Sequence, residues 1–314
     1  MNKPYVGGKS MLLELTKNVE KMVIGKADIV EKIVIALLCK GHVLLEDVPG
    51  VGKTTLVRAI AQSLDLTFSR IQFTPDLLPA DLLGVSIFNP KDGQFYFQKG
   101  PLHNQLILAD EINRTSPKTQ SSLLEVMQEQ QITVDNKTYK IQDPFMVIAT
   151  QNPIEHEGTF PLPESQLDRF FMKLSLGYPS EVEEFELLDY SNNIQELSKV
   201  IDAQMVIDAR EEVKKVHVAD PIKRYIIRLC RGTRKNEFIE LGASPRATLA
   251  LYDAVKAMAY LKNKSYVSPE DVKNLFIDIL SHRIFIAPQA KYQGKTEKII
   301  LKEILDSTAV PLEG

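Results

Sequence analysis

The sequence predicts an α/β fold in which helices cover a parallel sheet, followed by a smaller helical domain. Short apolar runs rich in β-branched residues alternate with helical patterns through the first half of the chain, as they do in parallel sheets. After residues 177–180 the strand pattern ends, and the remainder has the spacing of helices. The chain has 314 residues, which is enough for two domains with a substantial core. We therefore expect one domain over residues 1–178 and a second over residues 179–314.

Five runs have the length and composition of strands, and capping signals mark where several helices begin. The predicted strands are residues 42–46, 67–72, 106–109, 146–150 and 170–174. Apolar residues at Leu56, Ile60 and Leu64 recur every fourth position and predict one of the intervening helices. Ser116, Ser244 and Ser268 each precede a proline, which is the pattern of an N-cap followed by a first helical turn.

Two segments depart from this alternation and predict β-hairpins. Residues 84–99 hold two apolar runs joined by a turn-rich stretch that ends in Asp-Gly, a strong turn signal. Residues 131–141 hold two β-branched runs joined across Asp135 and Asn136. Both hairpins are expected as excursions from the sheet.

Composition and charge disfavour several classes of protein. The chain is 44% hydrophobic and 25% charged, as ordinary globular proteins are. Its apolar runs are too short for a membrane span or a signal peptide, so we expect a soluble cytoplasmic protein. The net charge of −3, with no dense Lys/Arg block, disfavours nucleic acid as a partner, although a basic stripe assembled only in the fold would escape this test.

Cysteine and histidine give no sign of a metal centre. Cys39 and Cys230 lie far apart within apolar helical patterns, which favours buried thiols over a disulfide or metal ligands. The histidines are scattered without ligand spacing, at His42, His103, His156, His217 and His282. We therefore expect no metal-hydrolase site.

The segment 47–54, with the sequence Asp-Val-Pro-Gly-Val-Gly-Lys-Thr, lies between an apolar strand and a helix, as a phosphate-binding loop does. Glycines let backbone amides surround a β-phosphate, Lys53 bridges β- and γ-phosphates, and the Thr54 hydroxyl reaches Mg²⁺. Asp47 takes the place of the usual first glycine, so a glycine-rich turn that only caps a helix stays as the alternative. The loop predicts that a nucleoside triphosphate binds here.

Two carboxylates, Asp110 and Glu111, directly follow the apolar strand 106–109. Ligands of open α/β sheets gather at the carboxyl ends of strands. Asp110 would hold Mg²⁺ through water, and Glu111 would orient or deprotonate the attacking water. A solvated turn is the alternative. The pair following a phosphate loop favours ATP hydrolysis and disfavours small-molecule kinases, which need no hydrolytic glutamate.

Three further polar residues complete the predicted chemistry. Asn152 follows the strand 146–150 and can hydrogen-bond the attacking water or the γ-phosphate; alternatively, it only stabilises the turn before the next proline. Arg169 and Arg246 can stabilise charge on γ-phosphate oxygens, and one can come from a neighbouring subunit. Taken alone, each arginine has the pattern of a surface ion-pair residue, and only its order among the other motifs favours catalysis.

These motifs together resemble the AAA+ ATPases and, within them, the MoxR family. The resemblance rests on LLEDVPGVGKT at 44–54, LILADEINRTSPKTQSSLLEVMQE at 106–129, VIATQNPIEHEGTFPLPESQLDRF at 147–170 and GASPRA at 242–247. It covers nearly the whole chain, and the ordered set is highly specific. Asp47 also fits the pattern of this family.

The resemblance implies an AAA+ three-layer αβα core with a five-stranded parallel sheet, an all-α lid domain, and a homo-hexameric ring that uses ATP and Mg²⁺. The implied catalytic residues are Lys53, Glu111, Asn152, Arg169 as a trans-acting arginine finger, and Arg246 as sensor 2. The implied metal ligands are Thr54 and, through water, Asp110. The implied nucleotide-binding residues are Val23, Ile24, Gly25, Asp47, Val48, Pro49, Gly50, Val51, Gly52, Lys53, Thr54 and Thr55. Arg114 is a further interface candidate.

The resemblance also implies roles for the hairpins and a class of partner. Residues 84–99 match the helix 2 insert and residues 131–141 the hairpin before sensor 1, which usually face the ring pore or a partner. The aromatic residues of the first hairpin are expected either to pack locally or to contact substrate: Phe88, Phe95, Tyr96 and Phe97. Relatives are regarded as chaperone-like factors that remodel or mature partner complexes, often with proteins that carry a von Willebrand factor A domain.

Three other functions stay open at this point. The chain could be a magnesium-chelatase-like motor subunit or a nucleic-acid-directed AAA+ motor, and the acidic net charge disfavours the second. It could also be a nucleotide-switched scaffold with negligible hydrolysis. The presence of Lys53, Asp110 and Glu111 disfavours that scaffold.

Overall fold

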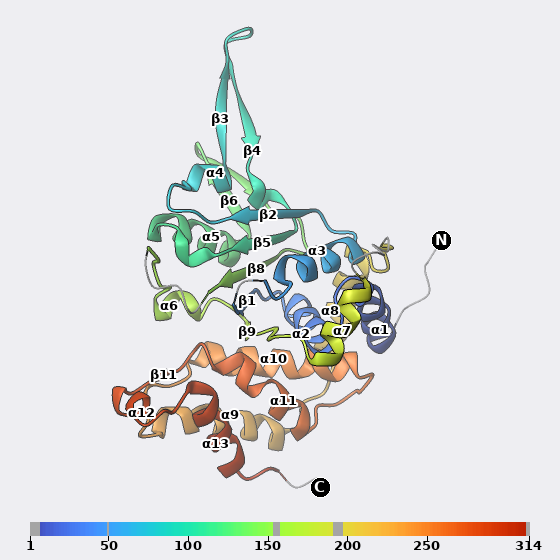
Figure 1. Cartoon of the computed structure of the whole chain (residues 1–314), viewed down its shortest axis with the longest axis vertical. Helices are drawn as coiled ribbons and strands as arrows, with labels where there is room; N and C mark the ends of the chain where they lie inside the picture. The colour runs from blue at the N-terminus through green and yellow to red at the C-terminus, as the bar shows by residue number, and fades with distance from the viewer. Residues whose placement is uncertain (1–6, 49, 153–157, 191–196, 312–314) are drawn as a thin grey trace.

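A five-stranded parallel sheet, in the order β2-β5-β8-β1-β9, forms the centre of the upper domain in Figure 1. The computed structural model describes residues 7–48, 50–152, 158–190 and 197–311. The strands are β1 (Val43–Glu46), β2 (Phe68–Gln72), β5 (Leu106–Asp110), β8 (Met146–Gln151) and β9 (Met172–Leu174). All five predicted strands are confirmed, and the last begins two residues later than predicted.

Helices cover both faces of this sheet because its strands are apolar on both sides. Leu106 and Leu108 of β5 join one buried cluster, which includes side chains of α1 (Gly8–Val19), α2 (Ala27–Leu38) and α3 (Lys53–Ser63). Ile107 and Ala109, which alternate with them, join a second cluster with α5 (Pro117–Glu129). The period of two along β5 therefore separates the two layers of helix.

The capping signals in the sequence correctly mark three helix starts. The Ser116 hydroxyl accepts a hydrogen bond from the Thr119 amide at 3.4 Å, and Ser244 does the same for Ala247 at 3.2 Å. Ser268 forms a capping box with Asp271. Side-chain oxygens at these positions satisfy amides that the first helical turn leaves without partners.

Both predicted hairpins are present, and the first projects from the body of the domain (Figure 1). Their strands pair antiparallel: β3 (Gly84–Asn89) with β4 (Gln94–Lys99), and β6 (Gln131–Val134) with β7 (Lys137–Lys140). The Phe97 ring stacks on Tyr139 at a centroid distance of 4.5 Å, so this aromatic packs between the two hairpins. Phe95 remains 69% exposed on the projecting hairpin.

The second half of the chain is mainly helical, as predicted. Its helices are α7 (Glu181–Tyr190), α8 (Ala203–Lys215), α9 (Asp220–Lys235), α10 (Pro245–Leu261), α11 (Pro269–Leu280), α12 (Pro288–Tyr292) and α13 (Glu297–Ser307). The short helical segments of the first half are α4 (Pro79–Leu83), α6 (Glu164–Leu167), η1 (Pro101–His103) and η2 (Ile112–Arg114). The lid also contains a short antiparallel pair, β10 (Ile239–Leu241) with β11 (Phe285–Ile286), which the sequence patterns did not reveal.

The packing of the second half ties it closely to the first. A continuous buried cluster joins residues of α1 and α2 to residues of α8 and α10. The boundary expected at residue 178 is therefore a change in secondary structure, and apolar packing continues across it. Among the described residues, no helix combines the length and apolar character that a membrane crossing requires.

His42 is buried immediately before β1 and gives the fold a pH dependence. Its Nδ1 accepts a hydrogen bond from the Val147 amide at 2.9 Å, which leaves Nε2–H to donate to the Met127 carbonyl at 2.9 Å. Burial lowers the pKa of His42 from 6.5 to about 4. The unfolded chain then binds more protons between these values, so stability is lost as the pH falls below 6.5. We expect this residue alone to account for a loss of about 2 kcal/mol at pH 5.

Urea unfolding of the wild type and His42→Gln at pH 7.5 and pH 5.0 measures this effect. The difference in unfolding free energy between the two pH values should be smaller in the variant by that amount. The pKa of buried His282 is also lowered by desolvation, and its contribution stays in both proteins. Equal pH differences in the two proteins would contradict the assignment to His42.

Candidate nucleotide-binding site

The loop between β1 and α3 has the backbone that a phosphate-binding loop needs. Gly50 and Gly52 have φ values of 86° and 89°, in the left-handed region that glycine adopts without strain. Helix α3 begins at Lys53, so its free amides face the loop. The Lys53 ammonium donates to the Asp47 carbonyl at 2.8 Å. Pro49 lies outside the described residues.

Asp47, which was expected to belong to the nucleotide-binding set, uses its carboxylate for another purpose. The side chain is buried and accepts hydrogen bonds from the Ser175 hydroxyl at 2.7 Å, the Leu176 amide at 2.7 Å and the Gly177 amide at 3.1 Å. It therefore ties the loop to the segment that follows β9. Asp47 thus stands where phosphate-binding loops usually have a glycine, and its side chain anchors the start of the loop. Only the backbone of Asp47 remains available for a contact with phosphate.

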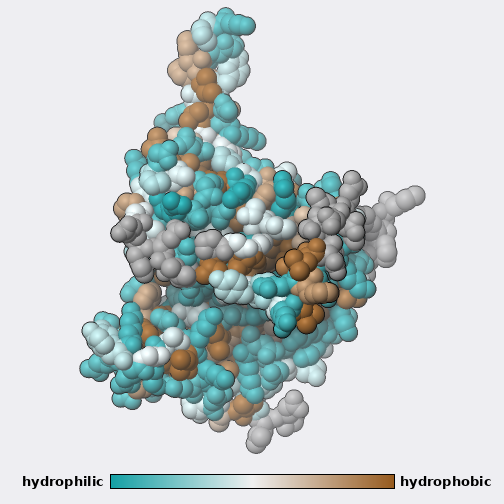
Figure 2. All heavy atoms as spheres, viewed as in Figure 1, coloured by the Kyte–Doolittle hydropathy of each residue, from teal (hydrophilic) through white to brown (hydrophobic). Residues whose placement is uncertain are grey.

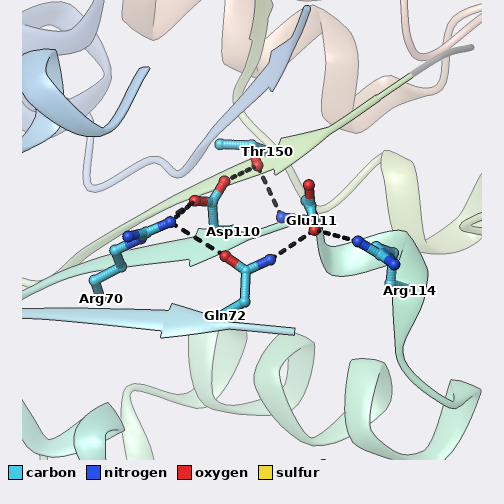
Figure 3. Close-up of polar contacts among 6 residues, drawn as sticks. All are labelled: Arg70, Gln72, Asp110, Glu111, Arg114 and Thr150. Atoms are coloured by element: carbon cyan, nitrogen blue, oxygen red, sulfur yellow. Dashed lines mark hydrogen bonds and ion pairs between the residues drawn. The ribbon is translucent and has the colours of Figure 1, made fainter. Parts of the chain in front are cut away.

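Asp110 and Glu111 lie together at the end of β5, and Thr150 of β8 holds both (Figure 3). The Thr150 hydroxyl donates to Asp110 Oδ1 at 2.6 Å and accepts from the Glu111 amide at 2.8 Å. Glu111 has a left-handed backbone with φ of 58°, which is unusual for a residue with a side chain. The extended strand therefore ends at Asp110, and the chain turns at Glu111.

Two residues of β2 that the sequence analysis did not identify complete this cluster. Arg70 donates to Asp110 Oδ2 from Nη2 at 2.8 Å and from Nε at 3.2 Å. Gln72 donates to Glu111 Oε2 at 2.6 Å, and Arg114 donates to the same oxygen at 2.9 Å (Figure 3). Arg70 and Gln72 are two residues apart in β2, so their side chains lie on the same face of the sheet. Only the strand order shows that β2 lies next to β5, which carries the two carboxylates.

Asn152 follows β8 at the same edge of the sheet and is buried. Glu46 of β1 is paired with Gln151 of β8, so the residue after β8 lies alongside the start of the glycine-rich loop. The carboxyl ends of β1, β5 and β8 thus bring together the loop, the carboxylate pair and the amide. Residues 153–157, which come next, lie outside the described residues.

An apolar pocket of about 600 Å³ adjoins the glycine-rich loop, and the sequence analysis did not identify it. Gly50 and Val51 line one side, and Tyr178, Phe185 and Leu188 are among the residues that line the rest. Phe185 is 69% exposed, and Figure 2 shows apolar side chains gathered over α7. The volume lies within the range of small-molecule sites.

Residues 23–25 lie beside α7, which also lines this pocket. Gly25 has a φ of 71°, and an added Cβ would collide with the Glu183 carboxylate of α7. Val23 is buried in the core, and Ile24 is partly buried. Among the described lining residues of the pocket, none belongs to segment 23–25.

Arg169 and Arg246 lie close together at the opposite end of the sheet, where β1 begins. They line one pocket of about 290 Å³ together with Gly41 and His42, which immediately precede β1. The glycine-rich loop begins after the other end of β1, so the four residues of this strand, roughly 13 Å, separate the two places. The structure therefore brings the two arginines together and keeps them apart from the loop of the same chain.

Contacts from the lid fix the segment that carries Arg169. The Phe170 carbonyl accepts from Arg283 Nη2 at 2.7 Å and lies 2.9 Å from His282 Nε2. The Ser244 hydroxyl, two residues before Arg246, donates to Asp168 at 3.3 Å. A movement of the lid would therefore displace both arginines together.

Comparison with known proteins identifies the same two parts of the chain, the sheet domain and the helical lid. Residues 42–172 match the model of the "ATPase family associated with various cellular activities (AAA)", and residues 231–304 match an AAA lid domain. A solved structure described as a putative ATPase from Cytophaga hutchinsonii superposes with a TM-score of 0.90 at 40% identity, covering 97% of this chain and 96% of that one. A glycine-rich loop, a carboxylate pair and a helical lid on this sheet define an AAA+ ATPase.

Two curated relatives match most of this chain, and the name of the first indicates the family. "Chaperone MoxR1" of Mycobacterium tuberculosis is 39% identical over 304 residues, covering 93% of this chain and 80% of the relative. "Uncharacterized protein YeaC" of Bacillus subtilis is 48% identical over 306 residues, with 96% of each chain covered. The chain belongs to the MoxR family of AAA+ ATPases.

Proposed function

We propose that this chain hydrolyses Mg²⁺·ATP at a site shared between two copies and uses the reaction to remodel a partner protein. The observation that carries the proposal is the division of the catalytic residues between opposite edges of the sheet. The loop, Asp110 and Glu111 lie at one edge, and Arg169 and Arg246 share a pocket at the other. A second copy that presents its arginine edge to this loop would complete the site.

The residues at the loop suit Mg²⁺·ATP. Thr54 in the first turn of α3 and Asp110 at the end of β5 offer a hydroxyl and a carboxylate oxygen, which are ligands that Mg²⁺ accepts alongside phosphate oxygens. When bound, the metal would neutralise charge on the β- and γ-phosphates. Lys53 would exchange its contact with the Asp47 carbonyl for the phosphates, and the amides of Gly50 and Gly52 would surround them.

Glu111 and Asn152 would act on the water. Glu111 would accept its proton or orient it toward the γ-phosphate, and Asn152 would donate to the water or to a γ-phosphate oxygen. Arg169 and Arg246 from the neighbouring copy would stabilise the charge that develops on the γ-phosphate oxygens. Because the lid fixes both arginines, loss of the phosphate would release them together and move one copy against the next.

The shared site favours a closed ring of identical chains, for which we propose a hexamer. A head-to-tail interface of this kind closes into a ring when its rotation allows. The name of the relative Chaperone MoxR1 supports a chaperone-like role. We propose a client protein with a von Willebrand factor A domain as the partner.

A substrate trap tests the remodelling proposal. Glu111→Gln should retain ATP and hold the client, and Lys53→Ala/Glu111→Gln, which cannot hold the phosphates, should release it. Affinity capture with both variants in the presence of ATP, followed by identification of the bound proteins, measures the difference. Equal capture by the two variants would contradict an ATP-dependent action on a partner.

The apolar pocket beside the loop is where we place the nucleotide base. Phe185→Ala should weaken ATP binding about twofold to tenfold, because an aromatic side chain next to a planar base contributes about 0.5 to 1.5 kcal/mol beyond area burial. Titration with a fluorescent ATP analogue measures this change. Tyr292→Ala, which removes an exposed aromatic of α12, is the control. Unchanged affinity of the Phe185 variant would place the base elsewhere.

A further inference from the structure

The ion pair between Arg70 and Asp110 occupies the carboxylate that the proposed mechanism gives to the metal. Both the Nε and Nη2 groups of Arg70 donate to Oδ2, at 3.2 and 2.8 Å. The other oxygen, Oδ1, accepts from the Thr150 hydroxyl at 2.6 Å. Each oxygen of Asp110 therefore already has a hydrogen-bond donor in this structure (Figure 3).

The two contacts differ in how easily they can be given up. Thr150 lies in a buried central strand, and its hydroxyl is also the acceptor for the Glu111 amide, so breaking its contact would disturb the whole carboxylate pair. Arg70 lies on the edge strand β2, and its side chain is 49% exposed, whereas that of Asp110 is 12% exposed. A guanidinium half in water loses little when it turns outward.

Arg70 also has a second acceptor that keeps it near the site. Its Nη2 group lies 3.2 Å from Gln72 Oε1. The guanidinium can therefore turn away from Asp110 and keep its hydrogen bond to Gln72. Because a guanidinium and a hydrated divalent cation at one carboxylate repel each other, both cannot be accommodated at Oδ2 without a cost.

We propose that Arg70 is a built-in cation that competes with Mg²⁺ for Asp110. It neutralises the carboxylate and holds its direction in the metal-free chain, and it turns away when metal and nucleotide bind. This inference rests on the proposed function, because it takes Asp110 as the carboxylate that serves the metal. Arg70 thereby sets the concentration of metal at which the site fills.

Metal binding to Arg70→Gln tests the inference directly. The probe is Mn²⁺ with a non-hydrolysable ATP analogue, followed by electron paramagnetic resonance, so the measurement does not depend on turnover. Glutamine keeps a hydrogen-bond donor and removes the charge. The dissociation constant for Mn²⁺ should fall roughly twofold to fivefold, as expected for the loss of one half-exposed ion pair. Arg224→Gln, at an exposed arginine of α9, should leave it unchanged.

A double-variant cycle separates competition from a general effect on the site. In an Asp110→Asn background, Arg70→Gln should no longer change Mn²⁺ affinity, because the ion pair is already lost. Unchanged or weaker Mn²⁺ binding by Arg70→Gln alone would overturn the inference and leave the proposed function intact. If the wild type bound neither Mn²⁺ nor the analogue, the proposed function itself would fail, and this inference with it.

Discussion

Replacing Glu111 by glutamine should lower ATP turnover by about a hundredfold to a thousandfold and leave nucleotide affinity nearly unchanged. The amide keeps the size of the side chain and can still accept from Gln72 or Arg114, so the local structure should persist. What it loses is the negative charge that attracts a proton from water. Phosphate release under saturating ATP measures the turnover, and binding of a fluorescent analogue measures the affinity.

In this structure the Glu111 carboxylate is held by two hydrogen bonds, so it must change its contacts before it can act as a base. Its Oε2 accepts from Gln72 and from Arg114, and it must turn toward the γ-phosphate to act on water. Glu125→Gln, on the exposed face of α5, removes the same charge from a helix that follows the site and should leave turnover unchanged. If Glu111→Gln kept at least half of the wild-type turnover, another group would have to serve as the base.

The sequence predicted the sheet because its strands are buried on both faces and its helices are well capped. β5 and β8 begin as apolar runs, and polar residues of the candidate site lie at or just after their ends. Periodicity cannot give the order of strands, and it gave no sign of the short pair β10 and β11. Two or three residues are too few to show a period, and the pair depends on a contact between distant segments.

The residues of the candidate site divide in the same way. Some are identified by local sequence patterns, and others only by contacts between segments that are distant in the sequence. Lys53, Asp110 and Glu111 are found from local motifs, because each follows a strand or opens a helix. Arg70 contributes through a contact across the sheet, and Phe185 contributes through a pocket that forms only when α7 meets the loop. Neither contact has a motif in the sequence. The same holds for the anchoring role of the Asp47 carboxylate.

Replacing Arg169 by alanine should lower ATP turnover by at least about a hundredfold without weakening nucleotide binding, because an arginine finger acts mainly on the transition state. The pocket of Arg169 lies beyond the amino end of β1, and the glycine-rich loop lies beyond its carboxyl end. The variant's own loop is therefore intact. Phosphate release and analogue binding measure the two effects, and Arg231→Ala, at an exposed arginine of the lid, is the control.

A mixture of two inactive variants decides whether the site is shared. Arg169→Ala keeps a complete loop and lacks the arginine, while Lys53→Ala keeps the arginine and lacks phosphate binding. Where a copy of the first meets the arginine edge of the second, the site is whole, so the mixture should turn over ATP faster than either variant alone. The lid contacts of Phe170 and Asp168 hold Arg169 beside Arg246, so Arg246→Ala should be rescued by Lys53→Ala in the same way. If the arginines served the loop of their own chain, neither mixture would recover activity.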